Sequence, residues 1–354
     1  MIGVPWAKES KQYAVLRSNA LNFASAELAP VADDLENTVD SPLLWKVVEK
    51  AGEMGMLAAL VPEQLGGEGV DLYSLCVALE ESAVECAGFA AALLFHNAAL
   101  VPLVYVDRKD LVEEFAKGRP LCTVATAGEV GLEDGKLNGS APFVFNVLEG
   151  TVALLFPGSG EGRKAAYVRT GAEGVQTRID PYPLGWRVSN FATLEVKGAE
   201  PVFVLDKSDK EALAATERTL YLGLAAIANG IVRKAFQKAY DYARQRYQAG
   251  KLIIEHQAMR LMLARMLCSM EEGRAIIRRA CGVEDLGPAI IAWRRAGANA
   301  CQAAMDGVQI HGGYGYMRDY GMERLMRDAK YCQMFPRPEE EQLLRLLDMA
   351  EEGG

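Results

Sequence analysis

Apolar side chains in the first third of the chain recur with the period of a helix. Ser41 and Pro42 favour a helix start, because serine caps an N-terminus and proline is tolerated in the first turn. Behind them a single apolar face is formed by Leu44, Val47, Val48 and Ala51. An alanine-rich stretch over residues 73–99 predicts a further long helix, which a glycine-rich loop at 66–69 precedes. We therefore expect a helical domain over residues 1–118.

The pattern changes character after Gly118-Arg119-Pro120. Short β-type runs separated by glycine-rich turns predict strands at 122–126, 143–145, 151–156, 165–168 and 192–196. Two further segments, 133–136 and 136–139, are typical of turns. This spacing predicts a small antiparallel barrel or sandwich over residues 119–208.

The last third returns to helical periodicity. One helix is expected to begin near Leu220 and to run to about Gln248, and a methionine-rich apolar stripe over 259–270 predicts a second. Gly287-Pro288 favours the start of a third helix, and residues 322–334 form another helical run. The expected fold is α+β and multidomain. It has an N-terminal helical domain, a central antiparallel β domain and a C-terminal four-helix bundle over residues 209–354.

Composition and charge narrow the classes of function. The net charge is −9, and the lysine and arginine residues are dispersed along the chain rather than clustered. This argues against a nucleic-acid partner, which would require a basic face. Seven cysteines without paired spacing and three histidines predict free thiols and no metal site. No signal peptide is expected at the N-terminus, and the apolar run 89–104 is broken by His96, Asn97 and Pro102. These features predict a cytoplasmic protein without a membrane span.

Candidate ligand-binding residues cluster in three segments of the last third. Arg246 lies where the first long helix is expected to end, and a guanidinium can bind a pyrophosphate through two hydrogen bonds. The amides of Gln248, Gln257 and Gln309 can bond ribose, ribityl or adenine edges. Gly312 and Gly313 lie in a glycine-rich turn that a ligand can approach closely. Any one of these residues alone is typical of an ordinary protein surface or helix end.

Taken together, these segments resemble a known family. Arg246-Tyr247-Gln248-Ala249-Gly250, His256-Gln257, Gln309-Ile310-His311-Gly312-Gly313-Tyr314-Gly315 and Arg327-Asp328-Ala329-Lys330 are similar, in order and spacing, to motifs of the flavin-dependent acyl-CoA dehydrogenases. The resemblance extends to Pro62-Glu63 with Gly66-Gly67 in the first domain, and to Gly185-Trp186-Arg187-Val188-Ser189 in the second. It implies FAD as cofactor, bound by Arg246, Gln248, Gln257, Gln309, Gly312 and Gly313. One departure is Ala249, where the family usually carries an aromatic residue near the adenine.

The resemblance fails at two positions that the chemistry needs. In this family a carboxylate removes the α-proton of an acyl thioester while a hydride leaves the β-carbon for the flavin. The position of that glutamate is occupied by Pro336, and the alternative position on the first bundle helix corresponds to about Leu220. A Gly-Ser-Asp segment of the β domain is also missing after Glu129. The sequence therefore predicts no catalytic residue of its own at these positions.

The retained motifs are those that the family donates to the flavin of a neighbouring subunit. The leading hypothesis is thus a non-catalytic subunit of a heteromeric, two-plus-two acyl-CoA dehydrogenase, completing its partner's FAD site in trans. The acyl-CoA would bind on the partner, with an electron-transferring flavoprotein as the usual acceptor. One alternative is a self-sufficient homo-oligomeric flavoenzyme, with Glu217 or one of Glu339, Glu340 and Glu341 as a displaced base or with altered chemistry. The other is a flavin-free scaffold.

Overall fold

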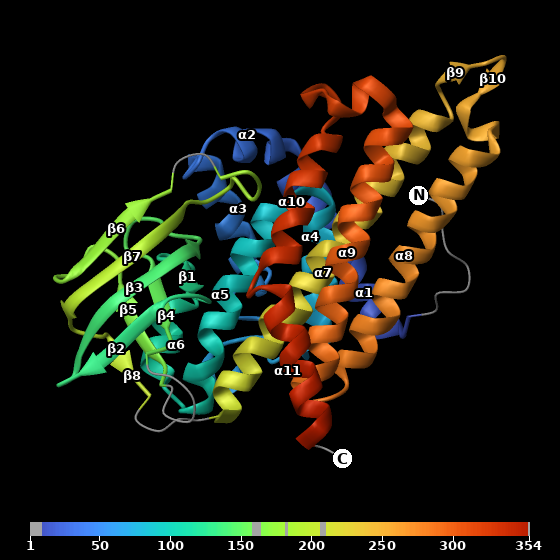
Figure 1. Cartoon of the computed structure of the whole chain (residues 1–354). Helices are drawn as coiled ribbons and strands as arrows, with labels where there is room; N and C mark the ends of the chain where they lie inside the picture. The colour runs from blue at the N-terminus through green and yellow to red at the C-terminus, as the bar shows by residue number, and fades with distance from the viewer. Residues whose placement is uncertain (1–8, 158–163, 181–182, 206–209, 353–354) are drawn as a thin grey trace.

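The computed structural model describes residues 9–157, 164–180, 183–205 and 210–352. Helices form the N-terminal part, strands the middle and long helices the C-terminal part (Figure 1). The β domain lies on one side of the helical body, and the long C-terminal helices form the opposite side (Figure 1). The expected α+β architecture is therefore confirmed. The division at 118/119 and 208/209 stays a prediction.

The N-terminal part is built of six α-helices with short helical turns between them. They are α1 (Lys11–Phe23), α2 (Ala32–Asn37), α3 (Pro42–Glu53), α4 (Leu72–Glu85), α5 (Ala87–Tyr105) and α6 (Lys109–Phe115). The turns are η1 (Ala24–Leu28), η2 (Ala29–Val31), η3 (Met56–Ala58) and η4 (Glu63–Leu65). The start of α3 is as predicted, because Ser41 Oγ accepts a hydrogen bond from the Leu43 N–H at 3.2 Å. Its predicted apolar face is the buried one.

The single helix expected over residues 73–99 is wrong, because α4 and α5 are separated at Cys86. The backbone of Cys86 is extended, with φ −150° and ψ 99°. The break reorients α5, and Gly88 in its first turn packs against the Trp186 backbone, where a Cβ would come within 3.1 Å. The continuous apolar pattern hides this break, since both helices are buried on nearly every side.

Helix α5 is long and apolar enough to cross a membrane by length and composition, and 94% of its most apolar window is buried inside the protein. The side chains of Asn97 and His96 form hydrogen bonds with neighbouring backbone, although His96 Nε2 is buried without a partner. Asn97 Nδ2 donates to Met56 O at 2.8 Å, and His96 Nδ1 accepts from the Cys122 N–H at 3.0 Å. These contacts are those of the central helix of a folded core.

The middle part forms two four-stranded sheets. One has the order β1-β4-β5-β8 and the other β2-β3-β7-β6. The strands are β1 (Cys122–Val124), β2 (Glu129–Glu133), β3 (Lys136–Phe145), β4 (Val152–Leu155), β5 (Ala166–Arg169), β6 (Val175–Ile179), β7 (Phe191–Ala199) and β8 (Phe203–Val204). All pairs are antiparallel except β1 with β4, which is parallel and corrects the purely antiparallel expectation.

The turn expected at 136–139 is also wrong. These residues begin β3 and pair with β2 on one side and with β7 on the other. Gly139 has a φ of 135°, and a Cβ there would come within 2.1 Å of the Glu129 carbonyl oxygen. The glycine therefore permits close strand pairing at an irregular position of the ladder rather than a chain reversal.

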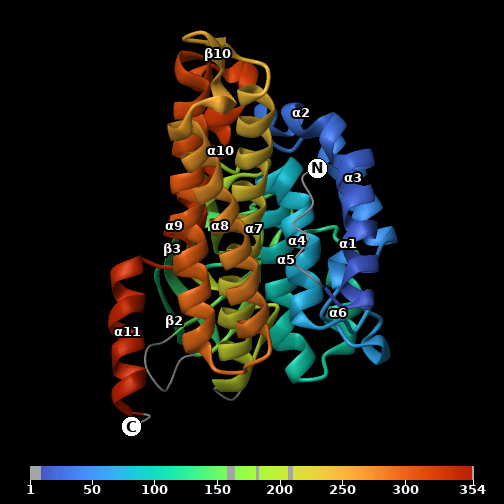
Figure 2. The same ribbon diagram turned by 90° about the vertical axis from the view of Figure 1, so that its right-hand side faces the viewer.

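The C-terminal part is a bundle of long helices. It consists of α7 (Lys210–Ala243), α8 (Gln257–Cys281), α9 (Leu286–His311) and α10 (Met322–Met334), with α11 (Glu339–Glu352) at its side (Figure 2). The short strands β9 (Tyr247–Gln248) and β10 (Lys251–Leu252) form a hairpin between α7 and α8. The turns η6 (Ile253–Glu255), η7 (Gly312–Tyr316) and η8 (Arg318–Tyr320) complete the connections. Helix α7 ends earlier than predicted, at Ala243.

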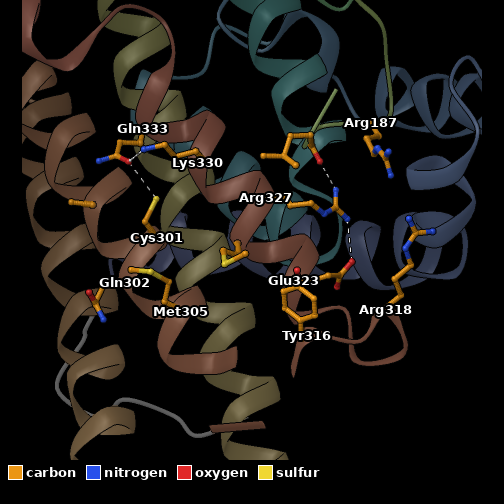
Figure 3. Close-up of a pocket in the computed structure, with 13 residues that line it drawn as sticks. Arg187, Cys301, Gln302, Met305, Tyr316, Arg318, Glu323, Arg327, Lys330 and Gln333 are labelled. Carbon is orange, nitrogen blue, oxygen red and sulfur yellow. Dashed lines mark hydrogen bonds and ion pairs between the residues drawn. The ribbon is translucent and has the colours of Figure 1, made fainter. Parts of the chain in front are cut away.

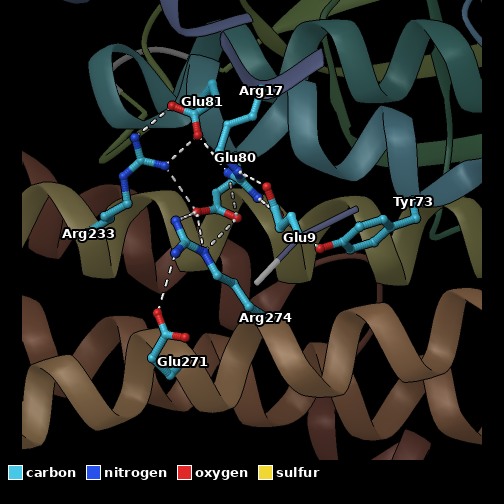
Figure 4. A network of polar contacts seen from close by, with 8 residues as sticks. All are labelled: Glu9, Arg17, Tyr73, Glu80, Glu81, Arg233, Glu271 and Arg274. Carbon is cyan, nitrogen blue, oxygen red and sulfur yellow. Dashed lines mark hydrogen bonds and ion pairs between the residues drawn. The ribbon is translucent and has the colours of Figure 1, made fainter. Parts of the chain in front are cut away.

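A buried ionic network ties the N-terminal helices to this bundle (Figure 4). Glu81 of α4 is fully buried, and its carboxylate contacts Arg17 of α1 and Arg233 of α7, each at 2.6 Å. Neighbouring Glu80 contacts Arg274 of α8 at 2.7 Å. The three arginines hold the pKa of Glu80 far below its usual range, against the opposing effect of burial.

Candidate functional site

The predicted ligand-binding residues meet at one end of the bundle. The turn of the β9–β10 hairpin places Ala249 and Gly250 at φ 51° and 83°, so both residues are left-handed as a tight two-residue hairpin requires. The backbone N–H of Ile253 donates to the Arg246 carbonyl at 2.8 Å and closes the base of the hairpin. The hairpin projects from the top of the body, at the end where α9 and α10 are joined (Figure 1).

An aromatic cluster fixes the glycine-rich turn beside this hairpin. The ring of Tyr242, at the end of α7, stacks on His311 with centroids 4.3 Å apart. Tyr320 packs edge-on against both rings, and Tyr314 lies 5.5 Å from Tyr320. The guanidinium of Arg246 lies over the Tyr314 ring at 5.9 Å. The segments that the sequence singled out separately are thus in contact, through aromatic residues that the sequence analysis did not use.

The polar side chains of this end are directed to solvent. Arg246, Gln248, Gln257 and Gln309 are all exposed, and among the described residues none of the four side chains has a hydrogen-bond or ion-pair partner. Burial of the neighbouring His311 lowers the pKa of its imidazole, and its Nδ1 lies 2.8 Å from the Gly307 carbonyl oxygen. The unpaired polar groups therefore surround a support of aromatic rings.

The glycines of the turn have different roles. Gly312 has a φ of 61°, and neither Gly312 nor Gly313 has any atom within 4 Å of the place where a Cβ would be. The surface above them is therefore open to a ligand. Gly315 instead packs on α9, where a Cβ would lie 2.6 Å from the Val308 carbonyl oxygen. Two glycines thus keep an open approach and the third allows the turn to fold back on the helix.

A groove of about 850 Å³ continues from this end down the face of α9 and α10 (Figure 3). Gln302 and Met305 line it, and their spacing places them on the helix face that also carries Gln309. The exposed side chains of Tyr316 and Arg318 also line the groove (Figure 3). The groove is absent from the sequence predictions, because its lining comes from α9, α10 and the segment before β7.

The β domain reaches the groove through the segment before β7. Leu184 and Arg187 line the groove, and the Trp186 N–H donates to Asp328 Oδ1 of α10 at 2.8 Å. Asp328 is almost fully buried, and its burial raises the pKa of the carboxyl to about 6, despite nearby Arg324 and Arg327. The two motifs that the sequence analysis singled out, Gly185–Ser189 and Arg327–Lys330, are thus held together by this buried contact.

The two positions at which the sequence analysis expects the family's base, Pro336 and Leu220, lie in apolar packing. Pro336 is buried and follows Phe335, whose ring lies 5.7 Å from both Trp186 and Phe191. Phe145 of β3 and Phe95 of α5 extend this aromatic core. Leu220, at the alternative position, is also buried. Neither position offers a proton acceptor.

The acidic side chains considered as displaced bases are mostly paired. Glu217 Oε2 contacts Arg345 of α11 at 2.9 Å, Glu339 contacts Arg294 at 2.8 Å and Glu341 contacts Arg337 at 3.3 Å. Glu340 is exposed. The first two pairs connect α11 to α7 and α9, which identifies a structural role for these carboxylates. Among the described residues no group of three His, Cys, Asp or Glu side chains is arranged to hold a metal ion.

Comparisons with known proteins identify the family. The model of the acyl-CoA dehydrogenase N-terminal domain matches residues 10–107, and that of the C-terminal domain matches residues 216–346. An acyl-CoA dehydrogenase of Bacillus subtilis (strain 168) is 31% identical over 92% of this chain and 94% of its own length. The chain belongs to the acyl-CoA dehydrogenase family.

Further relatives agree with this assignment. A short-chain-specific acyl-CoA dehydrogenase of Clostridium acetobutylicum is 27% identical, over 95% of this chain and 97% of its own length. A crystal structure of an acyl-CoA dehydrogenase complexed with FAD, from Bacillus anthracis, has the same fold, with a TM-score of 0.85 at 21% identity. It covers 97% of this chain and 68% of that chain. The family consists of FAD-dependent oxidoreductases that act on CH–CH bonds.

The exposed end of the bundle fits part of such a cofactor. A free guanidinium and three free amides next to an open glycine turn are suited to the phosphates and polar edges of a dinucleotide. These residues are suited to the dinucleotide end of FAD.

Proposed function

We propose that this chain is the non-catalytic subunit of a heteromeric FAD-dependent acyl-CoA dehydrogenase. In a two-plus-two assembly it would donate Arg246, Gln248, Gln257 and Gln309 to the FAD site of a catalytic partner. Bound FAD supplies the hydride acceptor for α,β-desaturation of an acyl-CoA. The observation that carries the proposal is the contrast between an exposed, unpaired polar end and an apolar core at both base positions.

Arg246 has the central role in this proposal. Its guanidinium has no carboxylate partner among the described residues, and the Tyr314 ring holds it beside the open Gly312-Gly313 surface. A planar guanidinium can donate two parallel hydrogen bonds to phosphate oxygens, which fixes orientation as well as charge. The amides of Gln248, Gln257 and Gln309 would then bind the sugar and base edges of the same dinucleotide.

The surface around the groove supports burial by another subunit. Large apolar side chains that a monomer rarely exposes together lie on α9, α10, α11 and the turn between α9 and α10. They are Ile291, Met305, Tyr316, Met317, Met334, Leu343, Leu344 and Leu347. A partner that covers this face would bring its own flavin site next to Arg246 and Gln309. An electron-transferring flavoprotein would then reoxidise the flavin at the partner, and the cytoplasm is the compartment that suits the free thiols.

The test compares two arginine substitutions in the complex that this chain forms with a co-expressed catalytic acyl-CoA dehydrogenase subunit. Arg246→Lys keeps the charge and removes the bidentate geometry, so FAD retention should weaken by about tenfold or more. Arg244→Lys changes an exposed arginine that lies over the Tyr240 ring instead, and should retain FAD like the wild type. Equal FAD retention by both variants would exclude a role for Arg246 in the site.

One observation favours a second function. The curated relatives align over nearly their whole length and are themselves named as complete dehydrogenases. A self-sufficient homo-oligomer would need a base, and Glu217 is the candidate nearest to the alternative position. Dehydrogenase turnover by this chain alone, abolished in Glu217→Gln, would establish this function. Turnover by the chain alone that Glu217→Gln leaves unchanged would exclude Glu217 as the base.

A further inference from the structure

Two cysteines from distant parts of the chain touch where α4 meets α8. Cys76 of α4 and Cys281 of α8 are separated by 205 residues, and their Sγ atoms lie 3.9 Å apart. Both are free thiols. The sulfurs are in van der Waals contact, and a disulfide requires an approach to about 2.05 Å. Closing that difference requires a change of side-chain rotamer or a shift of one helix end.

The register of the two helices holds these sulfurs together. Glu80 lies one helical turn after Cys76 on the same face of α4, and Arg274 lies two turns before Cys281 on the same face of α8. Glu80 and Arg274 form an ion pair at 2.7 Å (Figure 4). The ion pair and the thiol pair are therefore successive contacts of one antiparallel helix interface. The thiol pair therefore lies within the packed interface of α4 and α8.

The two thiols differ in their access to solvent. Cys76 is only 2% exposed, and its burial beside the second thiol raises its pKa. Cys281 is partly exposed and is the last residue of α8. Gly282 and the following residues to Asp285 are non-helical, so the helix end can yield without breaking α8. Arg218 of α7 donates to the Cys281 carbonyl at 2.7 Å and keeps this end on the bundle.

We propose that Cys76 and Cys281 form a redox-active thiol pair that a hydroperoxide closes into a disulfide, locking the N-terminal helices onto the bundle. The Cys281 thiolate attacks the peroxide, the O–O bond breaks, and a sulfenic acid forms with release of water. The Cys76 sulfur then attacks the sulfenic sulfur, the S–O bond breaks, and a second water leaves. The two thiols lose two electrons and two protons in total, which reduce one hydrogen peroxide to two waters.

The test treats the reduced full-length protein with hydrogen peroxide, alkylates the remaining thiols and maps the peptides. The expected product is an intramolecular Cys76–Cys281 link, with two fewer alkylated thiols than the seven of the reduced chain. The linked form should melt about 3 °C or more above the reduced form, because the link constrains the unfolded chain. Dithiothreitol should reverse both changes.

Two single variants serve as controls in the same experiment. Cys281→Ser should remove the link, leave Cys76 reduced and abolish the rise in melting temperature. Cys268→Ser removes an exposed thiol on the same helix, and it should change neither the Cys76–Cys281 link nor the rise in melting temperature. Peroxide that oxidises Cys268 while Cys76 and Cys281 stay reduced would overturn the proposal. A link that forms only in urea, or one that lowers the melting temperature, would overturn it as well.

Discussion

At the scale of single residues, the buried carboxyl of Asp328 links the β domain to α10. It accepts the Trp186 N–H at 2.8 Å, and its other oxygen lies 3.8 Å from Arg324 Nε. Burial outweighs these contacts and raises its pKa from 3.8 to about 6, and nearby Glu36 adds to the rise. The folded protein therefore binds a proton at Asp328 more tightly than the unfolded chain does.

This raised pKa gives a prediction with a defined sign. The stabilisation from proton binding at Asp328 is fully present below the unfolded pKa and is lost as the pH rises through about 6. The unfolding free energy of the wild type, measured relative to that of Asp328→Asn, should therefore fall by up to about 3 kcal/mol between pH 4 and pH 7.5. Thermal melts across this range measure the difference, with Asp319→Asn, an exposed aspartate, as the control substitution. A difference that grows with pH would contradict the assignment.

A second prediction at this scale concerns Glu81. Its carboxylate is fully buried between Arg17 and Arg233, so Glu81→Ala removes a 2.6 Å partner of each arginine and leaves the buried network, where Glu80 still contacts both, with an excess of positive charge. The substitution should cost about 3–5 kcal/mol of unfolding free energy. Denaturant unfolding measures it, and Glu53→Ala, which removes only an exposed partner of Lys50, should leave stability nearly unchanged. A small loss in Glu81→Ala would mean that water reaches the network.

At the scale of elements, the sequence predicts the helices better than the connections between them. The capped start of α3 and its buried face follow from local residues, as does the start of α9 at Gly287-Pro288. The break at Cys86 does not, because the apolar pattern runs through it and the close contact of Gly88 with the Trp186 backbone joins segments nearly a hundred residues apart. The position of Gly139 within a strand is equally hidden from the local sequence, because its close contact is with the carbonyl of Glu129 in the neighbouring strand.

The candidate site shows a similar division. The sequence identifies Arg246, Gln309 and the glycine turn, because each lies in a short contiguous motif and the motifs follow one another in a recognisable order. The aromatic supports Tyr242 and Tyr320 and the groove under Met305 depend on contacts between separate helices. A single sequence does not encode such contacts as a local pattern, so only the structure reveals them.

Helix α11 gives a prediction about assembly. Leu343, Leu344 and Leu347 are exposed along one of its faces, while Gln342 is buried toward the bundle. In the proposed assembly the partner subunit covers these leucines. Leu344→Lys with Leu347→Lys should therefore abolish co-purification with the partner and leave the melting temperature of the isolated chain within about 2 °C.

The matched control keeps that face apolar. Leu344→Met with Leu347→Met retains side-chain size and hydrophobicity, so co-purification should persist. Pull-down followed by native mass spectrometry measures both variants. Normal assembly of the lysine variant would place the partner on another surface.

At the scale of the whole molecule, the exposed polar end of the bundle and the apolar core at the predicted base position lie in different parts of the fold. Arg246 and the glycine turn lie at one end of the bundle, and Phe335 with Pro336 lies at the junction with the β domain. The proposed function rests on this separation, with the polar end completing a site on a neighbouring subunit. The assembly would then hold fewer flavins than chains.

Flavin content per chain, measured with native mass, tests this central claim most directly. The protein is purified alone and co-expressed with its catalytic partner, and the FAD released from each sample is quantified against total chain. The account predicts a colourless preparation alone and one FAD for each pair of unlike chains in the complex. One FAD per chain in a homo-oligomer of this protein would contradict it.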